Sequence, residues 1–314
     1  MRIGTATFDA SQVNAMARLN TQIAADLGAI SNGQQRAAAS DDPASAARSA
    51  RLARTQADNA RYASGLDLAE QRLGIMDKSL DGMANQLIRV KELAIQVSSE
   101  TSSASDHKVV LTELTQIQKS LVSLGNAQDG GGAYLFAGAR ASAPAFAQDA
   151  TTGAVVYNGL GEAAPVAVGD TATIRTSDSG PRLFGAITQA GGRSVFAVVA
   201  DFIAALQQPE PARGDDVAIA ARRQSLATAL DGATAATDRI ANVRADLGGR
   251  LNGVDSERAR LSAVGDGLAQ ARSSLDDTDY AATITSLQRA STILQATQKS
   301  FAQVSSLSLF NDLH

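Results

Sequence analysis

The chain has 314 residues, of which 44% are hydrophobic but only 4% aromatic, and it contains no Trp. Aromatic side chains normally dominate thick globular cores, so this composition favours thin cores such as seams between helices. The net charge is −4 and both signs are scattered along the chain, so neither nucleic acid nor an anionic membrane is expected as a partner.

The residues that catalysis or metal binding would need are nearly absent. Cysteine is missing, and the two histidines, His107 and His314, are expected to have solvated structural roles. No HExxH motif occurs, and no apolar run approaches 18 residues, so we expect no membrane insertion. Polar residues also interrupt the stretch between Arg2 and Arg18, so no cleaved secretory signal is expected. We therefore predict no enzyme activity, no catalytic or metal-binding residues and no cofactor.

The beginning of the chain carries apolar residues at alternating spacings of three and four, which predict one face of a helix. The members are Val13, Met16, Asn20, Ile23, Leu27 and Ile30. A helix of this length is marginal in water by itself, so it needs a partner. The series ends before a break that contains Asn32-Gly33, Arg36 and Ser40-Asp41-Asp42-Pro43. Because Pro43 suits a first helical turn and an Asp before it can cap, we predict a joint there between helical segments.

Two longer seams follow and predict an antiparallel helical hairpin. The first runs through Leu66, Ala69, Leu73, Met76, Leu80, Met83, Leu87, Val90, Ala94 and Val97, and the second through Val110, Leu114, Ile117, Leu121 and Leu124. Gly125-Asn126 then reads as a helix end. Asp129-Gly130-Gly131-Gly132 lacks the Lys of a phosphate-binding loop, so we interpret it as a loop that leaves the helix.

The helical period disappears between residues 130 and 192, where Gly, Pro, Thr and Asp become frequent. Val155-Val156-Tyr157 followed by Asn158-Gly159 predicts a strand and a tight turn, and 165–168 and 171–176 are candidate short strands. We therefore predict a small β-rich insertion over 138–190. Its apolar residues are few, so independent stability is not expected.

The second half of the chain is again helical. A short apolar helix is predicted around 195–206, and a long helix is predicted from residues that recur every seven positions. These are Leu226, Ala233, Ile240, Leu247, Val254, Leu261, Leu268 and Leu275. Arg244, Arg258 and Arg272 occupy alternate positions, which predicts an exposed flank. The acidic run at 276–279 lacks the spacing of a calcium loop, so N-capping by Thr278 or Asp279 is preferred.

The end of the chain repeats the pattern of its beginning, through Tyr280, Ile284, Leu287, Ser291, Leu294, Gln298 and Phe301. Neither end is apolar enough to form a domain alone, so we predict that the two ends pair. The fold class is mainly α, with long coiled-coil helices from both ends of the chain and the small β-rich insertion between them.

Several short motifs stand out beside the periodic segments. Near the start are Met1-Arg2-Ile3, Asn32-Gly33 to Arg36 and Ser40-Asp41-Asp42-Pro43-Ala44. The segment Tyr134-Leu135-Phe136-Ala137-Gly138 is preceded by Gly131-Gly132-Ala133, and the chain ends in Ser308-Leu309-Phe310-Asn311-Asp312-Leu313. The first set resembles the flagellin superfamily. The segment that ends at Gly138 is similar to the G-x-Y-[LI]-F-A-G motif of the hook–filament junction protein family within it, and the ending also resembles that family.

The resemblance implies an inner terminal coiled coil (1–42 with 277–314), a helical middle domain (43–137 with 191–276) and an outer β-rich domain (138–190), with Ser40, Asp41, Asp42 and Pro43 between the first two. It also implies an extracellular flagellar subunit, exported through the flagellar type III apparatus. The implied partners are copies of itself in a ring, the adjoining hook-associated ring protein, flagellin, and an export chaperone on the C-terminal segment. The residues expected in the assembly seam are Val13, Met16, Ile23, Leu27, Ile30, Ile284, Leu287, Leu294 and Phe301.

Three alternatives remain open at this point. A filament flagellin would share the superfamily motifs and differ in copy number. A surface module that binds glycans or a receptor would use the insertion, although its aromatic candidates are only Phe146, Tyr157 and Phe184. A helical hydrolase would need a nucleophile–base pair, and the sequence offers none that is plausible.

Overall fold

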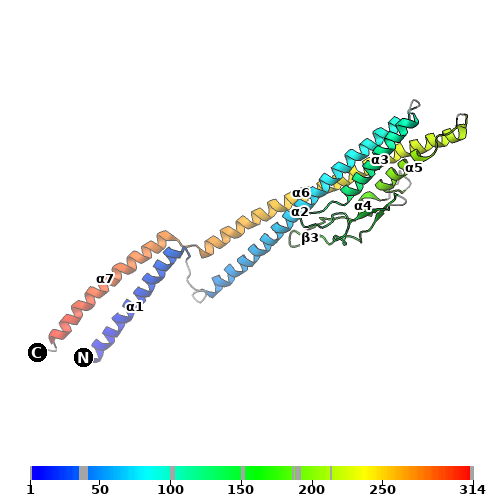
Figure 1. The fold of residues 1–314 in the computed structure, drawn as a ribbon. Helices are drawn as coiled ribbons and strands as arrows, with labels where there is room; N and C mark the ends of the chain where they lie inside the picture. Colours follow the sequence, from blue (N-terminus) through cyan, green and yellow to red (C-terminus); the bar gives the residue numbers. More distant parts are fainter. Residues whose placement is uncertain are drawn as a thin grey trace. The chain divides into compact units, whose positions relative to one another are not determined.

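A computed structural model describes residues 2–34, 42–99, 103–149, 153–185, 187, 192–212 and 214–311. The chain divides into two compact units, Met1–Asp58 with Ala263–His314 and Asn59–Ser262 (Figure 1). The predicted boundaries of the inner domain, at 42/43 and 276/277, fall at the start of one long helix and at the end of another, whereas this division falls inside both helices. The three-domain scheme therefore stays a prediction.

The terminal unit contains helix α1 (Arg2–Asn32) and helix α7 (Tyr280–Asn311), with the first part of α2 (Pro43–Val97) and the last part of α6 (Asp216–Asp276). Helices α1 and α7 pack against each other, so the predicted pairing of the two ends is confirmed. The pairing is antiparallel, because Gln22 donates to Ser286 (3.1 Å) while the Thr278 hydroxyl donates to the carbonyl of Ala29 (3.2 Å).

The break before α7 is built by two adjacent residues. Asp279 accepts a hydrogen bond from the backbone N–H of Ala282 at 3.0 Å and so caps α7, as the sequence predicts. Thr278 is buried instead, and its backbone N–H donates to the carbonyl of Gly33 at 3.0 Å. The acidic run is therefore a helix start tied to the end of α1.

The second unit is organised around α2, which packs with α3 (Ala104–Gly125) as the predicted antiparallel hairpin. Ser79 donates to the carbonyl of Leu124 at 2.6 Å, and Arg89 pairs with Glu113 at 2.6 Å, so the two helices run in opposite directions. Every predicted seam position of α2 from Leu66 to Val97 is buried. This apolar row holds the hairpin together through burial of aliphatic side chains.

Helix α6 lies antiparallel to α2, and the arginines at its alternate positions explain the interrupted apolar row. Arg244 pairs with Asp77 (3.0 Å) and Asp81 (2.7 Å). Arg258 pairs with Asp67 (2.6 Å) and Glu70 (2.8 Å), one turn apart on α2. The seven-residue series itself is buried from Leu226 to Leu261, as predicted. The arginines therefore flank the seam and bridge to α2.

The segment between α3 and α6 holds two separate two-stranded antiparallel sheets, β1 (Phe146–Gln148) with β2 (Val155–Tyr157) and β3 (Val166–Ala167) with β4 (Thr173–Ile174). Helices α4 (Gly180–Phe184) and α5 (Val195–Gln207) follow. The predicted strands are confirmed, but the tight turn at Asn158-Gly159 is wrong. The N–H of Asn158 donates to the carbonyl of Ala145 at 2.8 Å, so the chain continues in the direction of β2 past its last residue.

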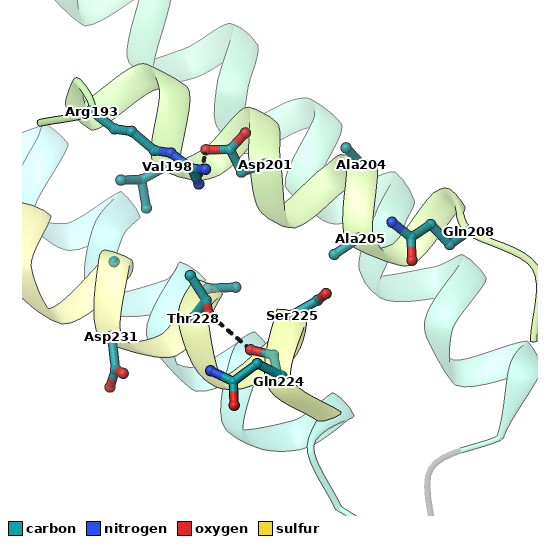
Figure 2. Close-up of a pocket in the computed structure, with 12 residues that line it drawn as sticks. Arg193, Val198, Asp201, Ala204, Ala205, Gln208, Gln224, Ser225, Thr228 and Asp231 are labelled. Atoms are coloured by element: carbon teal, nitrogen blue, oxygen red, sulfur yellow. Dashed lines mark hydrogen bonds and ion pairs between the residues drawn. The ribbon is translucent and has the colours of Figure 1, made fainter. Parts of the chain in front are cut away.

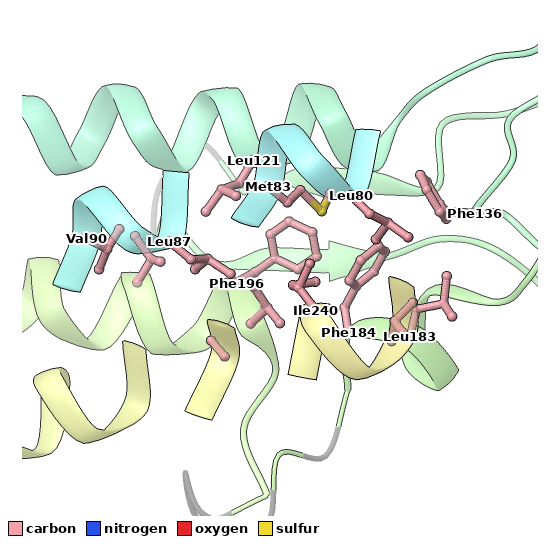
Figure 3. Close-up of a cluster of buried hydrophobic side chains, with 14 of the residues drawn as sticks. Leu80, Met83, Leu87, Val90, Leu121, Phe136, Leu183, Phe184, Phe196 and Ile240 are labelled. Carbon is pink, nitrogen blue, oxygen red and sulfur yellow. The ribbon is translucent and has the colours of Figure 1, made fainter. Parts of the chain in front are cut away.

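The insertion shares its core with the helices. Phe146 lies 4.6 Å from Phe196 of α5 and 5.7 Å from Phe184, measured between ring centroids. Figure 3 shows Phe184 and Phe196 among Leu80 and Leu87 of α2 and Ile240 of α6. The aromatic residues of the insertion are therefore used for packing against the helices, which explains how so few apolar residues suffice.

The Tyr134–Gly138 segment connects the hairpin to this shared core. Leu135, Phe136 and Ala137 are buried, and the Leu135 carbonyl accepts a hydrogen bond from the Ser177 hydroxyl at 2.7 Å. Gly138 has φ +62°, and a Cβ there would lie 2.1 Å from the carbonyl oxygen of Gly161. The motif ends in glycine because its backbone is left-handed and the backbone of Leu160 and Gly161 passes too closely for a side chain.

The expectation of a solvated His107 is wrong. His107 is buried, its Nδ1 lies 2.6 Å from Glu210, and Arg222 approaches the same nitrogen at 3.1 Å. Glu210 and Arg222, near the start of α6, cover the first turn of α3, which the sequence predicts to be solvated. The cluster formed by His107, Glu210 and Arg222 thus joins three parts of the chain: α3, the segment between α5 and α6, and α6 itself.

Candidate assembly surface on the paired terminal helices

The described residues outside the terminal unit offer no catalytic arrangement. They contain no group of three or more His, Asp or Glu side chains suited to a metal ion, and no helix among them has the length and apolarity to span a membrane. A groove of about 670 Å³ lies between α5 and α6 (Figure 2). Its lining combines small side chains with an ion pair between Arg193 and Asp201 at 2.6 Å, and it brings together no nucleophile and base.

The aromatic residues proposed for a glycan site are also unsuited to that use. Phe146 and Phe184 are buried, and Tyr157 is half-buried against Phe146 at 5.4 Å between ring centroids. Stacking on a ligand requires an accessible ring face, and these packed rings do not offer one. The candidate functional surface is therefore sought on the terminal helices α1 and α7.

The seam between α1 and α7 mixes large apolar residues with polar ones. On α1 the half-buried positions step by four and three through Gln12, Met16, Leu19, Ile23, Asp26 and Ile30. On α7 the corresponding positions are Thr283, Leu287, Ala290, Leu294, Thr297 and Phe301, with Ala290 buried. Met16, Ile23 and Ile30 thus lie in the half-buried row of α1, and Leu287, Leu294 and Phe301 lie in the half-buried row of α7. Their role in assembly stays a prediction.

The remaining members of the predicted seam lie outside it. Val13, Asn20 and Leu27 are each one residue beyond the seam row Gln12, Leu19 and Asp26, and they are exposed. On α7, Ile284, Ser291 and Gln298 are likewise one residue beyond Thr283, Ala290 and Thr297, with Ile284 and Gln298 exposed. The structure thus divides the predicted residues into an inward seam and an outward row on each helix.

The two outward rows belong to the same flank of the helix pair. Gln22 precedes the seam residue Ile23 and its side chain meets Ser286, which precedes the seam residue Leu287. On each helix, the residue that follows Asp26 or Thr283 and the residue that precedes Ile23 or Leu287 lie on opposite sides of the seam, because successive residues turn by about 100°. Leu27 and Ile284 therefore share the flank that faces away from Gln22 and Ser286.

This flank carries three exposed large apolar side chains. Val13 is 54% exposed, Leu27 52% and Ile284 42%. We call the surface formed by these three residues the outer face. Polar Asn20, Ser291 and Gln298 lie among them on the same rows. Large apolar side chains gathered on one side of a thin helix pair are typical of a surface that another protein covers.

The opposite flank holds a groove of about 580 Å³ between α1 and α7. Leu19 and Ile293 form its apolar sides, and small residues of α7 such as Ala282 and Ala290 line it. Arg289 is the one charged residue of this lining. We call this surface the Leu19–Ile293 groove.

The predicted joint is described only in part. Ser40, Asp41 and Arg36 lie outside the described residues. The carboxylate of Asp42 accepts a hydrogen bond from the N–H of Ser45 at 3.0 Å, and Pro43 is the first residue of α2. Asp42 therefore caps α2, which agrees with the local prediction from the Asp-Pro pair.

Comparison with known proteins places the helical ends in one family. Residues 3–141 match the bacterial flagellin N-terminal helical region, and residues 230–313 match the bacterial flagellin C-terminal helical region. These regions contain nearly all of α1 with the whole of α2 and α3, and most of α6 with the whole of α7. The chain belongs to the flagellin superfamily.

Relatives of known name narrow the comparison. The chain is 28% identical to the flagellar hook-associated protein 3 of Escherichia coli (strain K12) over 294 residues, which is 90% of each chain. It is also 28% identical to the protein of the same name from Salmonella typhimurium, again over 90% of each chain.

Solved structures show the same fold. The flagellar hook-associated protein 3 of Legionella pneumophila superposes with a TM-score of 0.65 at 16% identity, covering 71% of this chain and 98% of that one. FlgL of Xanthomonas campestris superposes with a TM-score of 0.62 at 21% identity, covering 70% of this chain and 99% of that one.

Proposed function

We propose that this protein is a structural subunit of the bacterial flagellum that forms the junction ring between the hook and the flagellin filament. The observation that carries the proposal is the similarity over 90% of the chain to two proteins named flagellar hook-associated protein 3. The outer face supports it, because Val13, Leu27 and Ile284 give the terminal helices an apolar surface that a single copy leaves uncovered.

The mechanism we propose is packing of helices between subunits. The inward seam pairs the two ends within one copy, and the outer face then packs against a neighbour. Because the seam contains Gln12, Asp26, Thr283 and Thr297 among its apolar residues, the pair gains little from burial alone. Contact with neighbours would supply the missing burial, so a stable pair is expected mainly in the assembled ring.

The partners follow from this position in the flagellum. They are other copies of the chain in a ring, the adjoining hook-associated ring protein on the hook side, and flagellin on the filament side. An export chaperone would hold the C-terminal segment before assembly. The protein would reach the cell exterior through the flagellar type III apparatus.

Deletion of the gene tests the proposal. Cells without the protein should carry hooks that lack filaments and should release flagellin into the medium. Immuno-gold labelling of whole flagella should give one band beyond the hook. Label along the whole filament would instead identify a flagellin, and normal filaments in the deletion strain would refute the junction function.

A further inference from the structure

We propose that Asn158 is a site of self-modification, at which the side-chain amide is lost and an aspartate or isoaspartate residue forms, with Arg140 as the activating group. The reaction takes place on the exposed peptide group between Asn158 and Gly159, just after β2. It needs only water as a co-reactant. The inference is independent of the proposed flagellar function, because it concerns the chemistry of the insertion and not the assembly of the subunit.

The reaction begins on the peptide group that joins the two residues. The backbone nitrogen of Gly159 loses its proton and attacks the side-chain Cγ of Asn158. A new C–N bond forms, and the amide nitrogen takes up a proton and leaves as ammonia. Water then opens the five-membered succinimide ring at either carbonyl, which gives aspartate or isoaspartate. In isoaspartate the main chain runs through the side-chain methylene, so it is longer by that group.

The chain contains three Asn-Gly pairs, and the backbone around them decides which one reacts. They are Asn32-Gly33, Asn158-Gly159 and Asn252-Gly253. Because glycine has no Cβ, its nitrogen is sterically open to ring closure at all three positions. The dipeptide alone therefore predicts three equivalent sites, and the tertiary structure distinguishes between them.

Helical backbone protects two of the three pairs. Asn252 and Gly253 lie inside α6, where each backbone N–H donates to the carbonyl four residues earlier. Ring closure turns the peptide group out of this ladder and breaks its hydrogen bonds. Asn32 is the last residue of α1, and the carbonyl of Gly33 accepts a hydrogen bond from the N–H of Thr278 at 3.0 Å, which holds Gly33 in place.

The peptide nitrogen of Gly159 is not held in this way. Asn158 is exposed and lies outside β2, and the N–H of Gly159 donates no hydrogen bond within the described part of the chain. The residues on either side are anchored. The N–H of Asn158 donates to the carbonyl of Ala145 at 2.8 Å, and the N–H of Leu160 donates to the carbonyl of Ala137 at 3.1 Å. The reactive nitrogen therefore lies between two fixed points.

Arg140 supplies the activation. Its Nη1 donates to the backbone carbonyl oxygen of Asn158 at 3.2 Å, and this carbonyl belongs to the same peptide group as the attacking nitrogen. When the nitrogen loses its proton, the negative charge is shared with that oxygen. A guanidinium at the oxygen stabilises the charge, as preorganised donors stabilise oxyanions in enzymes. Arg140 forms no ion pair with a described residue, so no carboxylate neutralises it.

The fold also requires the glycine of this pair. A Cβ at Gly159 would lie 2.1 Å from the hydroxyl oxygen of Tyr157 and 2.6 Å from the carbonyl oxygen of Ala137. The second of these atoms belongs to the backbone beside the Tyr134–Gly138 segment, which cannot move aside as a flexible side chain can. The residue that makes Asn158 reactive is therefore the one that packing demands.

The two products should differ in stability. Isoaspartate adds its methylene between the two anchored N–H groups, so the hydrogen bonds to Ala145 and Ala137 cannot both be kept. Aspartate leaves the main chain unchanged and places a carboxylate beside Arg140. The isoaspartate form should therefore be the less stable of the two.

Peptide mapping by mass spectrometry measures all three sites in one sample. The purified full-length chain is incubated in mildly alkaline buffer, and samples taken over time are digested under mildly acidic conditions that halt the reaction. We expect conversion at Asn158 to be at least several-fold faster than at Asn32 or Asn252, and to speed up with rising pH because the nitrogen must lose its proton. Conversion at Asn32 or Asn252 that is as fast as at Asn158 would overturn the inference.

Variants at position 140 test the activation separately. Arg140→Gln keeps hydrogen-bond donors but removes the charge, so it should slow conversion at Asn158 several-fold and leave the rate at Asn252 unchanged. Arg140→Lys keeps the charge and should retain most of the rate. If Arg140 only fixed the segment in place, its loss would loosen the backbone and quicken the reaction. A rate in Arg140→Gln that is unchanged or faster would therefore overturn the activating role.

The melting temperature tests the difference between the products. Asn158→Asp reproduces the aspartate product and should melt like the fresh wild type, whereas wild-type protein after long incubation should melt lower. Asn158→Gln lacks the side-chain length for a five-membered ring, so incubation should leave its melting temperature unchanged. Incubated wild type that contains isoaspartate and melts like the fresh chain would overturn the structural consequence.

Discussion

Arg250 of α6 donates a hydrogen bond to Asp178 at 2.5 Å, and Asp178 is only 1% exposed. Asp178 lies just before α4, so this pair fixes the end of the insertion to the long helix. The backbone N–H of Asp178 also donates to the carbonyl of Leu135, at 3.2 Å. The pair thus connects the insertion, the Tyr134–Gly138 motif and α6 at one point.

Asp178→Ala should destabilise the second unit strongly. Removing one partner of a buried ion pair costs about 3–5 kcal/mol, and Arg250 would keep only the exposed carboxylate of Asp246. Urea unfolding should show this loss in the free energy of unfolding. Asp246→Ala is the matched control, because Asp246 binds the same Arg250 from an exposed position, and it should cost about 1 kcal/mol or less. Equal losses in the two variants would contradict the structural role of Asp178.

Two glycines of α2 should respond in opposite directions to alanine. At Gly65 a Cβ would lie 2.7 Å from the carbonyl oxygen of Ala167 in β3, whereas at Gly74 nothing lies within 4 Å. Gly65→Ala should therefore lower the melting temperature, because backbone must move. Gly74→Ala should raise stability by up to about 1 kcal/mol through helix propensity. Calorimetry of the two variants distinguishes these effects, and stabilisation by both would show that β3 does not pack closely on α2.

Asp129 should make the second unit sensitive to acid. Burial raises the pKa of its carboxyl, but the N–H groups of Ala133 and Gly131 and the Arg72 guanidinium together hold this pKa below its usual value. A depressed pKa in the folded state means that the stabilisation is present above about pH 4 and is lost as the pH falls below it.

Asp129→Asn should therefore cost about 1–3 kcal/mol at pH 7 and less at pH 3. Urea unfolding measured from pH 7 to pH 3 should show the wild-type and variant free energies converging. Curves that stay parallel over this range would show that the carboxylate does not carry the stabilisation.

The outer face and the inward seam should differ in their response to serine. Leu27→Ser removes an exposed side chain, so helix content and melting temperature should change little while filament retention falls. Ile23→Ser changes a half-buried seam residue and should lower the helix content of the terminal unit. Val217→Ser, at 82% exposure on α6, is the control for loss of an exposed apolar side chain and should retain filaments. Circular dichroism and a motility assay check these outcomes, and normal motility of Leu27→Ser would contradict the assembly role of the face.

The long helices could be predicted from the sequence because their apolar rows repeat over many turns. The row from Leu66 to Val97 and the seven-residue series from Leu226 to Leu261 are buried as predicted, since a helix turns a regular spacing into a continuous stripe. The pairing of the two chain ends and the Asp279 cap follow from similarly local rules.

The seam of the terminal pair required the tertiary structure. Val13, Leu27 and Ile284 are more apolar than Gln12, Asp26 and Thr283, so spacing and hydrophobicity alone favour the first set for the seam. The helices are rotated so that the second set faces inward and the first set is exposed. Periodicity identifies rows but does not say which of two adjacent rows meets a partner.

The sequence by itself thus determined the helical class, the pairing of the ends and the absence of a recognisable catalytic motif, because each follows from spacing along the chain. Only the tertiary structure decided that His107 is buried, that Phe146 and Phe184 belong to a shared core, and that Leu27 and Ile284 form one exposed face. Those features depend on which distant elements approach one another. Burial is a property of that approach, and no local pattern specifies it.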